Sequence, residues 1–487
     1  MLETITAVNQ AVNSFIWGIP AMVCIIGVGL LLSVRTGFLQ LRKFPYAIKT
    51  TIGRIFRKKD ASDGAMTPFQ AVCTALAATV GTGNIAGVAG AIAIGGPGAV
   101  FWMWCSALLG MCTKFSEVTL AVHFRERNKN GELVGGPMYY IKNGLGSRWQ
   151  FLAVLYSLFG VLTVFGTGNA TQVNTIVTAI DSALLAYGSS LNSILPTVNL
   201  VVGVVVAMMV AMVLLGGVKR IGSVTEKLVP FMALFYVVLA LGVVVINYRR
   251  FPAVLASIVG GAFDPQAFTG GAIGSIFLSM QKGVSRGIFS NEAGLGSAAI
   301  SAAASTTDDP ARQGYVSMTG TFIDTIIVCT ITGLTIASSG VLGTIGPDGK
   351  PLTGVVLTMA AFSTHLGTAG NWIVSVGIML FAYSTILGWE YNGEKAWEYL
   401  WGTHTYNIIY RLAFSLVVYV GATQTLDLVW NLSDIANALM AVPNLVSMLV
   451  LAPVIKEEVL RFEAVIAKEK AGRKEALLEK NEETLHI

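Results

Sequence analysis

Long runs of apolar residues, most of them 20 residues or more in length, dominate the chain. A hydrocarbon core of roughly 30 Å needs about 20 apolar residues of helix, so each such run predicts a membrane-spanning helix. The runs do not alternate between polar and apolar positions, as the strands of a membrane barrel do. The sequence therefore predicts an all-α polytopic membrane protein with 11 transmembrane helices. Their approximate ranges are 12–34, 69–95, 98–122, 150–180, 195–216, 228–247, 268–304, 312–338, 371–390, 408–422 and 427–452.

Composition and charge agree with this pattern. Hydrophobic residues make up 54% of the chain and charged residues 12%, about half the usual charged fraction of a soluble domain. Eight Lys and Arg residues crowd the loop from Arg35 to Lys59, which the positive-inside rule assigns to the cytoplasm. Alternation from that loop predicts an N-terminus outside and a C-terminus inside. Residues 456–487, rich in Lys, Arg and Glu, are expected to form a solvated amphipathic cytoplasmic helix.

The second run contains Gly81-Thr82-Gly83-Asn84 near its middle. Glycine costs about 1 kcal/mol in a helix interior and tolerates unwinding, so this string predicts a break in the helix. Inside a membrane an unwound turn persists only where protein or water satisfies its backbone groups, which marks a cavity or a ligand site. Close helix packing through Gly83-x-x-x-Gly87 is the alternative.

The run at 268–304 is about 37 residues long, too long for one straight span, and it is rich in glycine. We interpret it as a second broken helix. This second broken helix lies five spans after the first and enters the membrane from the opposite side, so the two breaks open two five-helix units of opposite topology. The chain then divides into an extra N-terminal helix with its basic loop (1–60), the two units (61–250 and 251–455) and the tail (456–487). Inverted repeats that each open with a broken helix are typical of secondary transporters.

Two further strings complete a resemblance: Gly135-Gly136-Pro137-Met138-Tyr139-Tyr140-Ile141 and Gly287-Ile288-Phe289-Ser290-Asn291-Glu292-Ala293-Gly294-Leu295-Gly296-Ser297. With Gly81-Thr82-Gly83-Asn84 and Gly388-Trp389 in order, the chain resembles the alanine or glycine:cation symporter family over essentially its whole length. The resemblance implies the five-plus-five fold of the bacterial leucine transporter preceded by one extra helix, which agrees with the count above. It also implies a bacterial or archaeal cell membrane.

An amino acid brings a carboxylate and an ammonium into low dielectric, and both need partners there. Half-helix N-termini offer N–H groups to the carboxylate, and unwound carbonyls suit the ammonium and a cation. The candidate substrate residues are Thr82, Gly83 and Asn84 at the first break, Gly287 and Phe289 on the second broken helix, Phe165 and Gln172 on the fourth run, and Trp389. For the string Gly166-Thr167-Gly168-Asn169 before Gln172, small-residue packing is an open alternative, and Trp389 is open to a second interpretation as an interfacial anchor.

The resemblance suggests a sodium site between the first broken helix and the run at 371–390. Hydroxyls of Ser384 and Thr385, with carbonyls of Ala77, Val80 and Phe381, would form a shell of neutral oxygens suited to Na⁺. The alternative for the two hydroxyls is a hydrogen bond to the preceding helical turn. Because no carboxylate is expected next to the first break, we favour Na⁺ over H⁺ as the coupling ion.

Charged residues inside the runs need partners, since each costs about 2.5–3.5 kcal/mol on insertion scales. Lys114 and Glu117 are expected to pair three residues apart. Arg286, Glu292 and Asp324 are candidate gate or structural charges, and we expect Arg286 and Glu292 to share a cytoplasmic gate or helix-tethering network. A static salt bridge is the alternative.

These features predict a secondary transporter that imports alanine or glycine with Na⁺ by alternating access. A proton-coupled symporter is the alternative, and a channel is a more distant one. No metalloprotease or paired aspartate motif occurs in a span, so an enzyme is not expected. The expected partners are a small amino acid and the lipid bilayer, without nucleic acid, and the sequence leaves the oligomeric state open.

Overall fold

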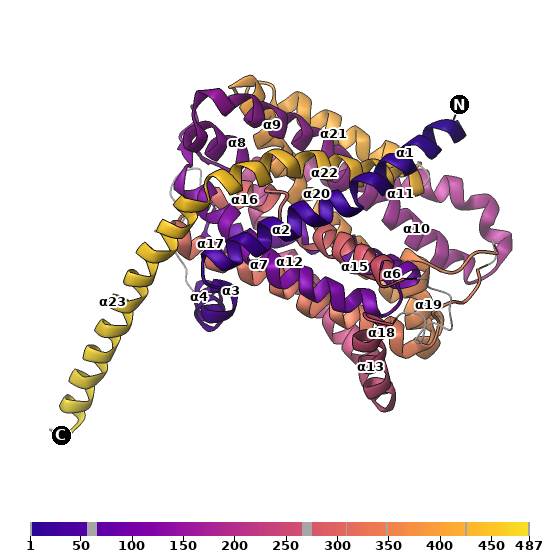
Figure 1. Cartoon of the computed structure of the whole chain (residues 1–487). Helices are drawn as coiled ribbons and strands as arrows, with labels where there is room; N and C mark the ends of the chain where they lie inside the picture. Colours follow the sequence, from indigo (N-terminus) through magenta and orange to yellow (C-terminus); the bar gives the residue numbers. More distant parts are fainter. Residues whose placement is uncertain are drawn as a thin grey trace.

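The computed structural model describes residues 2–55, 66–264, 275–307, 309–346, 349–423 and 426–485. In these residues the chain is a bundle of helices, and the only sheet in this described part is a short antiparallel hairpin of β1 (Glu126–Arg127) and β2 (Leu133–Val134). The last helix leaves the bundle at one end (Figure 1).

The helices of the first half are α1 (Leu2–Ile16), α2 (Ile19–Arg35), α3 (Leu39–Arg42), α4 (Phe44–Ile55), α5 (Pro68–Thr79), α6 (Ala86–Gly95), α7 (Gly98–His123), α8 (Pro137–Tyr140), α9 (Gln150–Phe165), α10 (Thr171–Leu185), α11 (Leu195–Leu214) and α12 (Gly217–Ile246). Those of the second half are α13 (Phe251–Gly261), α15 (Ile276–Asn291), α16 (Ser297–Ala303), α17 (Pro310–Thr321), α18 (Thr330–Ser339), α19 (Gly354–Leu366), α20 (Thr368–Trp401), α21 (Asn407–Gly421), α22 (Leu426–Val450) and α23 (Ala452–Leu485). Short 3-10 or π-helical segments join them: η1 (Thr82–Asn84), η2 (Ile141–Leu145), η3 (Ser147–Trp149), η4 (Gly166–Ala170), η5 (Ser189–Ile194), η6 (Tyr248–Arg250) and η7 (Phe322–Cys329).

Seven helical segments of the described chain are long and apolar enough to cross a membrane, or nine if each of two sharply bent pairs is one span. The described residues therefore form a helical membrane protein. Helix α21 has 15 residues, fewer than the roughly 20 that a hydrocarbon core needs. Residues 268–274, the beginning of the predicted run 268–304, lie outside the described residues.

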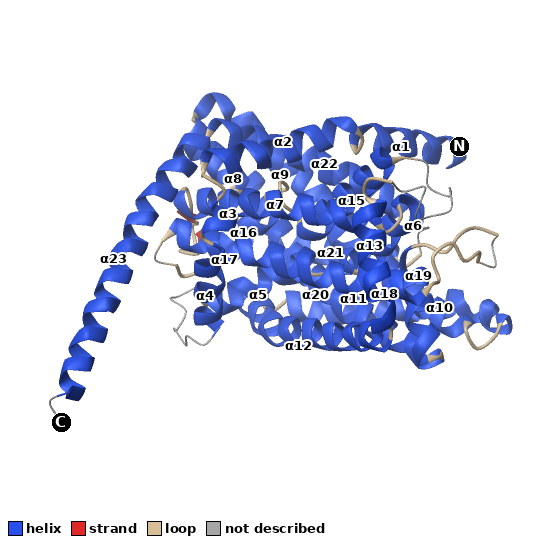
Figure 2. Ribbon diagram, turned by 60° about the horizontal axis from the view of Figure 1, so that its bottom comes forward, coloured by secondary structure: helices blue, strands red, loops and turns tan. Residues whose placement is uncertain are grey.

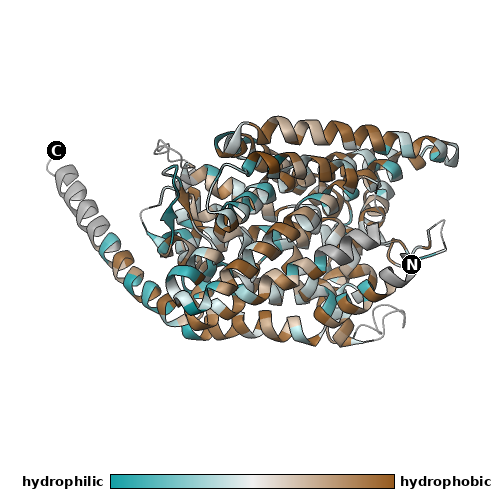
Figure 3. Ribbon diagram, turned by 90° about the horizontal axis from the view of Figure 1, so that it is seen from above, coloured by the Kyte–Doolittle hydropathy of each residue, from teal (hydrophilic) through white to brown (hydrophobic). Residues whose placement is uncertain are grey.

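The apolar outer face of the bundle matches a lipid environment. Helices α11 and α12 expose large hydrophobic side chains, among them Met208, Met212, Leu234 and Val238. Figure 3 shows hydrophobic residues along the outer helices and hydrophilic residues gathered at the end from which α23 leaves. A water-soluble monomer rarely exposes so continuous an apolar surface, whereas a bilayer covers it.

The two ends of the bundle carry different segments. Helices α3, α4, α8 and α17 lie at the end where α23 leaves, whereas the N-terminus, α6 and α19 lie at the opposite end (Figure 1, Figure 2). The described part of the predicted cytoplasmic loop, up to Ile55, and the start of the tail thus share one end, as the predicted alternation requires. Which end faces the cell interior stays a prediction.

Helix α23 follows α22 after a bend of 62° and packs its first half against the bundle. Ile455, Val459, Phe462 and Ile466 are buried, so the expectation of a solvated tail helix is wrong for this half. The apolar stripe at spacings of three and four residues belongs to the expected amphipathic helix, but it packs on the bundle and does not face solvent.

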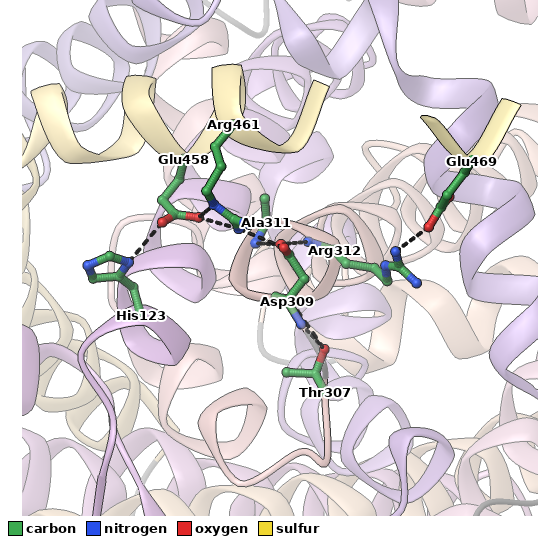
Figure 4. A network of polar contacts seen from close by, with 8 residues as sticks. All are labelled: His123, Thr307, Asp309, Ala311, Arg312, Glu458, Arg461 and Glu469. Atoms are coloured by element: carbon green, nitrogen blue, oxygen red, sulfur yellow. Dashed lines mark hydrogen bonds and ion pairs between the residues drawn. The ribbon is translucent and has the colours of Figure 1, made fainter. Parts of the chain in front are cut away.

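Charged contacts reinforce this packing. Arg461 of α23 donates to Asp309 at 2.6 Å and to Glu458 at 2.7 Å, and Glu458 contacts His123 of α7 at 3.0 Å (Figure 4). Asp309 is the N-cap of α17 and accepts from the backbone of Ala311 and Arg312. Arg312 also pairs with Glu469, and Glu463 pairs with Arg42 and Lys43. We call this set of ion pairs the tail clasp.

Candidate substrate and cation site

The first predicted break is present. Helix α5 ends at Thr79, Val80 and Gly81 are extended, η1 makes one tight turn, and α6 starts at Ala86 with a bend of 54°. The Gly81 N–H, which a continuous helix would direct to the Ala77 carbonyl, donates instead to the Asn84 side-chain oxygen at 2.8 Å. The Asn84 N–H likewise bonds to the Gly81 carbonyl and not to that of Val80. The break therefore releases the Ala77 and Val80 carbonyls from the helical pattern.

The hydroxyl pair of α20 faces this turn. Ser384 and Thr385 both donate to the Phe381 carbonyl, at 2.8 and 2.9 Å, which is the alternative raised from the sequence. That bond uses each hydroxyl proton and leaves oxygen lone pairs as acceptors. A Cβ added to Gly81 would lie 2.4 Å from the Thr385 Oγ1, so α20 and the break touch without room for a side chain. Released carbonyls and hydroxyl oxygens are a donor set that fits a hard cation such as Na⁺.

A second contact joins the break to α10. The Thr82 hydroxyl donates to Gln172 at 2.9 Å, and the Gln172 amide donates to the Thr167 carbonyl of η4 at 2.9 Å. Gln172 is buried. A Cβ added to Gly168 would lie 2.3 Å from the Cβ of Trp389, so η4 also packs directly on α20. The structure thus brings Thr82, Gln172 and the neighbourhood of Trp389 to one side of the break.

Phe289 of α15 lies on the other side of the break. A Cβ on Gly83 would meet the Phe289 ring at 3.3 Å, and the Arg286 guanidinium lies 5.5 Å from the centroid of the same ring. Phe289 therefore separates the break from Arg286.

Asp324, on η7, has its carboxylate directly at the first break. It accepts from Asn84 at 2.7 Å, from Ser290 at 2.9 Å and from Thr325 at 2.7 Å, and it is completely buried. The expectation that no carboxylate lies next to this break is wrong. Asp324 is 240 residues from Asn84 in the chain, and no local pattern in the sequence signals the contact.

The second broken helix is also present. Helix α15 ends at Asn291, Glu292 and Gly296 adopt left-handed backbone conformations, and α16 begins at Ser297. A Cβ on Gly296 would lie 2.3 Å from the Pro137 ring, so the two long strings that carry the family resemblance pack on each other here.

Glu117 of α7 stabilises this second break. Its Oε1 accepts from the N–H groups of Gly294 and Gly296, at 2.9 and 3.0 Å, and from Asn444 at 2.7 Å. No ion pair joins Glu117 to Lys114, whose buried Nζ has no hydrogen-bonding partner among the described residues. The expected direct ion pair does not form, because Glu117 faces the unwound backbone of a helix that the sequence does not place beside it, although the Lys114 charge still interacts with the Glu117 carboxyl group.

Two predicted substrate residues point elsewhere. The Phe165 ring packs on Tyr410 and Phe414 of α21, with centroids 5.6 and 5.9 Å away. Gly287 faces α7, since a Cβ there would lie 2.5 Å from the Ser106 hydroxyl. Phe165 was predicted from helix membership, which does not fix the face that a side chain presents, whereas Gly287 was expected to act through a backbone acceptor for the ammonium and stays a prediction.

Arg286 and Glu292 belong to separate clusters. Arg286 makes two hydrogen bonds with Asp434 of α22, at 3.3 and 3.2 Å, whereas Glu292 accepts from Ser297 at 2.5 Å. Arg286 also lines a polar cavity of about 370 Å³ together with residues of α1, α6 and the start of α19. These elements lie at the end opposite the tail clasp (Figure 1), so if the tail is cytoplasmic, as predicted, Arg286 lies toward the outer side and not in a cytoplasmic network.

Comparison with known proteins gives one consistent result. Residues 2–476 match the family described as the sodium:alanine symporter family. The chain is 45% identical over 466 residues to the sodium/alanine symporter AgcS of Methanococcus maripaludis, which covers 95% of this chain and 98% of that protein. It is 47% identical over 458 residues to an uncharacterized transporter of Haemophilus influenzae, covering 93% and 95%. A probable sodium/glutamine symporter of Bacillus subtilis, GlnT, is 35% identical over 448 residues, covering 91% and 87%.

The fold has a solved counterpart. The crystal structure of MhsT in complex with L-phenylalanine superimposes with a TM-score of 0.56 at 13% identity, over 82% of this chain and 99% of that one. At this identity the likeness concerns the fold, which is that of the leucine-transporter group.

Proposed function

The chain belongs to the sodium:alanine symporter family, and from this premise we propose that it imports small neutral amino acids, alanine or glycine, together with Na⁺ by alternating access. Membership in a transporter family indicates a transporter and not an enzyme. In the proposed architecture, eleven spans form an extra N-terminal helix and two inverted five-helix units, with the N-terminus outside a bacterial or archaeal cell membrane.

The observation that supports the proposal is the unwound turn at Gly81-Thr82-Gly83-Asn84, which contacts both the candidate cation site and the candidate substrate site. On one side it lies against Thr385, and on the other Thr82 bonds to Gln172. We assign the cation to the carbonyls of Ala77, Val80 and Phe381 with the hydroxyls of Ser384 and Thr385. A bound cation would fix the turn, and a fixed turn would present its N–H groups to the substrate carboxylate.

The substrate assignment is narrower than the set expected from the sequence. The Asn84 side chain and N–H are engaged within the protein, so the first N–H groups of η1, on Thr82 and Gly83, are the proposed carboxylate donors. Gln172, Phe289 and Trp389 would form the walls, Gly287 stays a candidate backbone acceptor for the ammonium, and Phe165, which packs on α21, leaves the set.

Asp324 supports a second candidate, coupling to H⁺. A buried carboxyl at the break is a group that can carry a proton, and the sequence-based argument against H⁺ assumed that no such group was there. Sodium remains the first choice because the oxygen donors at Thr385 need no titratable group and because relatives are named for sodium.

Uptake of labelled alanine into proteoliposomes tests the proposal. Uptake is expected to require a Na⁺ gradient at equal pH on both sides and to be inhibited by glycine. Uptake driven by a pH gradient without Na⁺ would assign the coupling to H⁺. Inhibition by glutamine but not by glycine would indicate that the substrate is glutamine, the amino acid for which GlnT is named. An absence of counterflow would contradict the assignment as a symporter.

A further inference from the structure

The extra N-terminal helix pair reaches the Arg286–Asp434 pair. Helices α1 and α2 are separated by a turn at Trp17 and Gly18, and the Trp17 side chain is buried. Its indole N–H donates to the backbone carbonyl of Asp434 at 2.8 Å. Asn13, one turn earlier, donates to the Asp434 Oδ2 at 3.4 Å.

Trp17 also connects to the helix that carries Arg286. The Trp17 carbonyl accepts from Gln281 of α15 at 3.0 Å. Gln281 and Arg286 lie on the same helix, five residues apart. Trp17 therefore bonds through its side chain to the residue that bears the carboxylate and through its backbone to the helix that bears the guanidinium.

The ion pair forms part of the wall of the polar cavity. Arg286, Asp434, Asn13 and Trp17 all line the cavity. Beyond Arg286 comes the Phe289 ring, and beyond that ring comes Gly83. The pair thus lies in the cavity wall, next to the ring that contacts the first break, and we call it the gate pair.

We propose that Trp17 is a positioning residue for the gate pair, and that the N-terminal helix pair is consequently part of the gate and not only a membrane anchor. The indole N–H fixes the Asp434 backbone, and Asn13 orients its carboxylate, so that both oxygens meet the two terminal nitrogens of Arg286. A bidentate pair needs this fixed geometry, because a carboxylate that rotates keeps only one of the two bonds. The inference rests on the proposed function for its transport readout.

Trp17→Phe is the test variant, since it keeps an aromatic ring and removes only the donor. Trp104→Phe is the matched control, because the Trp104 indole also donates across helices, to Thr330 at 2.7 Å, without contacting the cavity. We expect Trp17→Phe to raise the KM for alanine about five-fold, the fold-change of one lost hydrogen bond, with little change in Vmax. Trp104→Phe should keep the wild-type KM.

A second readout needs no transport. With Cys24 and Cys105 replaced by serine, Ser285→Cys places one thiol in the cavity wall beside Arg286. A membrane-impermeant thiol reagent should label it several times faster in the Trp17→Phe background than in the wild type or Trp104→Phe. A merely structural role for Trp17 would lower the amount of folded protein without changing this rate per molecule.

Equal KM values and equal labelling rates in Trp17→Phe and Trp104→Phe would overturn the inference. Should Trp17→Phe fail to accumulate, Gln281→Leu removes the other bond of Trp17 and is judged by the same two criteria. If the wild type transports no amino acid but Trp17→Phe labels faster, the proposed function fails and the gate assignment stands.

Discussion

The Asn84 side-chain amide donates to the Asp324 carboxylate at 2.7 Å, and this contact joins the first broken helix to the helix that follows the second. Ser290, from the end of α15, donates to the same carboxylate. One buried carboxyl group thus contacts the break in α5–α6 and the end of α15 at once. A change in charge or in ligand occupancy at either break would alter the hydrogen bonds at the other through Asp324.

Asp324→Asn is expected to reduce alanine uptake about 100-fold, the effect of losing roughly 3 kcal/mol from a charge-assisted network. The asparagine amide keeps the shape of the aspartate side chain but lacks the negative charge to which Asn84, Ser290 and Thr325 donate. Initial uptake rates at saturating Na⁺ measure this. Asp181→Asn is the control, because Asp181 of α10 accepts from Asn199 of α11 at 3.0 Å, which is also an Asn–Asp contact between helices. Uptake at the wild-type rate in Asp324→Asn would reduce the cluster to a structural role.

Thr385→Val should raise the Na⁺ concentration for half-maximal uptake about ten-fold, as expected when one oxygen ligand worth roughly 1.4 kcal/mol is lost. Valine keeps the shape of threonine and removes the proposed ligand. Thr178→Val deletes a hydroxyl with the same bond to the preceding turn, at 2.9 Å on α10, and should leave Na⁺ dependence unchanged. An equal Na⁺ dependence in both variants would remove Thr385 from the ion site.

Gly81→Ala should abolish Na⁺-dependent uptake while the protein still inserts. The added methyl group would lie 2.4 Å from the Thr385 Oγ1, so α20 and the break must separate. Gly242→Ala in α12 meets nothing within 4 Å and gains helix propensity, so it should be as stable as the wild type or up to about 1 kcal/mol more stable. Comparison of uptake per folded molecule separates the two. Full activity in Gly81→Ala would mean that this contact does not matter.

The tail clasp should respond to salt. Arg461→Met keeps an unbranched apolar chain and removes the contacts to Asp309 and Glu458, both at a half-exposed guanidinium. Because exposed pairs contribute about 0–1 kcal/mol each, we expect a melting temperature a few degrees lower in detergent at low salt. The difference from the wild type should shrink at high ionic strength, where the pairs are screened. A difference that stays constant with salt would assign the effect to packing.

Local sequence was enough to predict the breaks. Glycines at 81 and 83, the excess length of the run at 268–304 and the hydroxyl pair at 384–385 all act through the backbone or the immediate neighbours, and the structure has both breaks and the Thr385 contact with Gly81. The residues of the sodium and substrate sites stay proposals.

The errors concern partners far apart in the chain. Arg286 was paired with Glu292 by proximity, whereas its partner Asp434 is 148 residues away. Such contacts are set by how the helices pack together, and a single sequence records that packing only weakly.

The three bonds at Glu117 have a consequence for biogenesis. Glu117 enters the membrane in the third predicted span, but its Asn444 partner follows 327 residues later. At roughly 5–20 residues per second, synthesis of the intervening chain takes on the order of 20–60 s. Gly294 and Gly296 follow 177 and 179 residues after Glu117, so the carboxyl group first lacks all three donors and then lacks Asn444, and the first half of the chain cannot reach its mature packing as an isolated intermediate. Newly made chains must complete both halves before either becomes resistant to quality-control proteases.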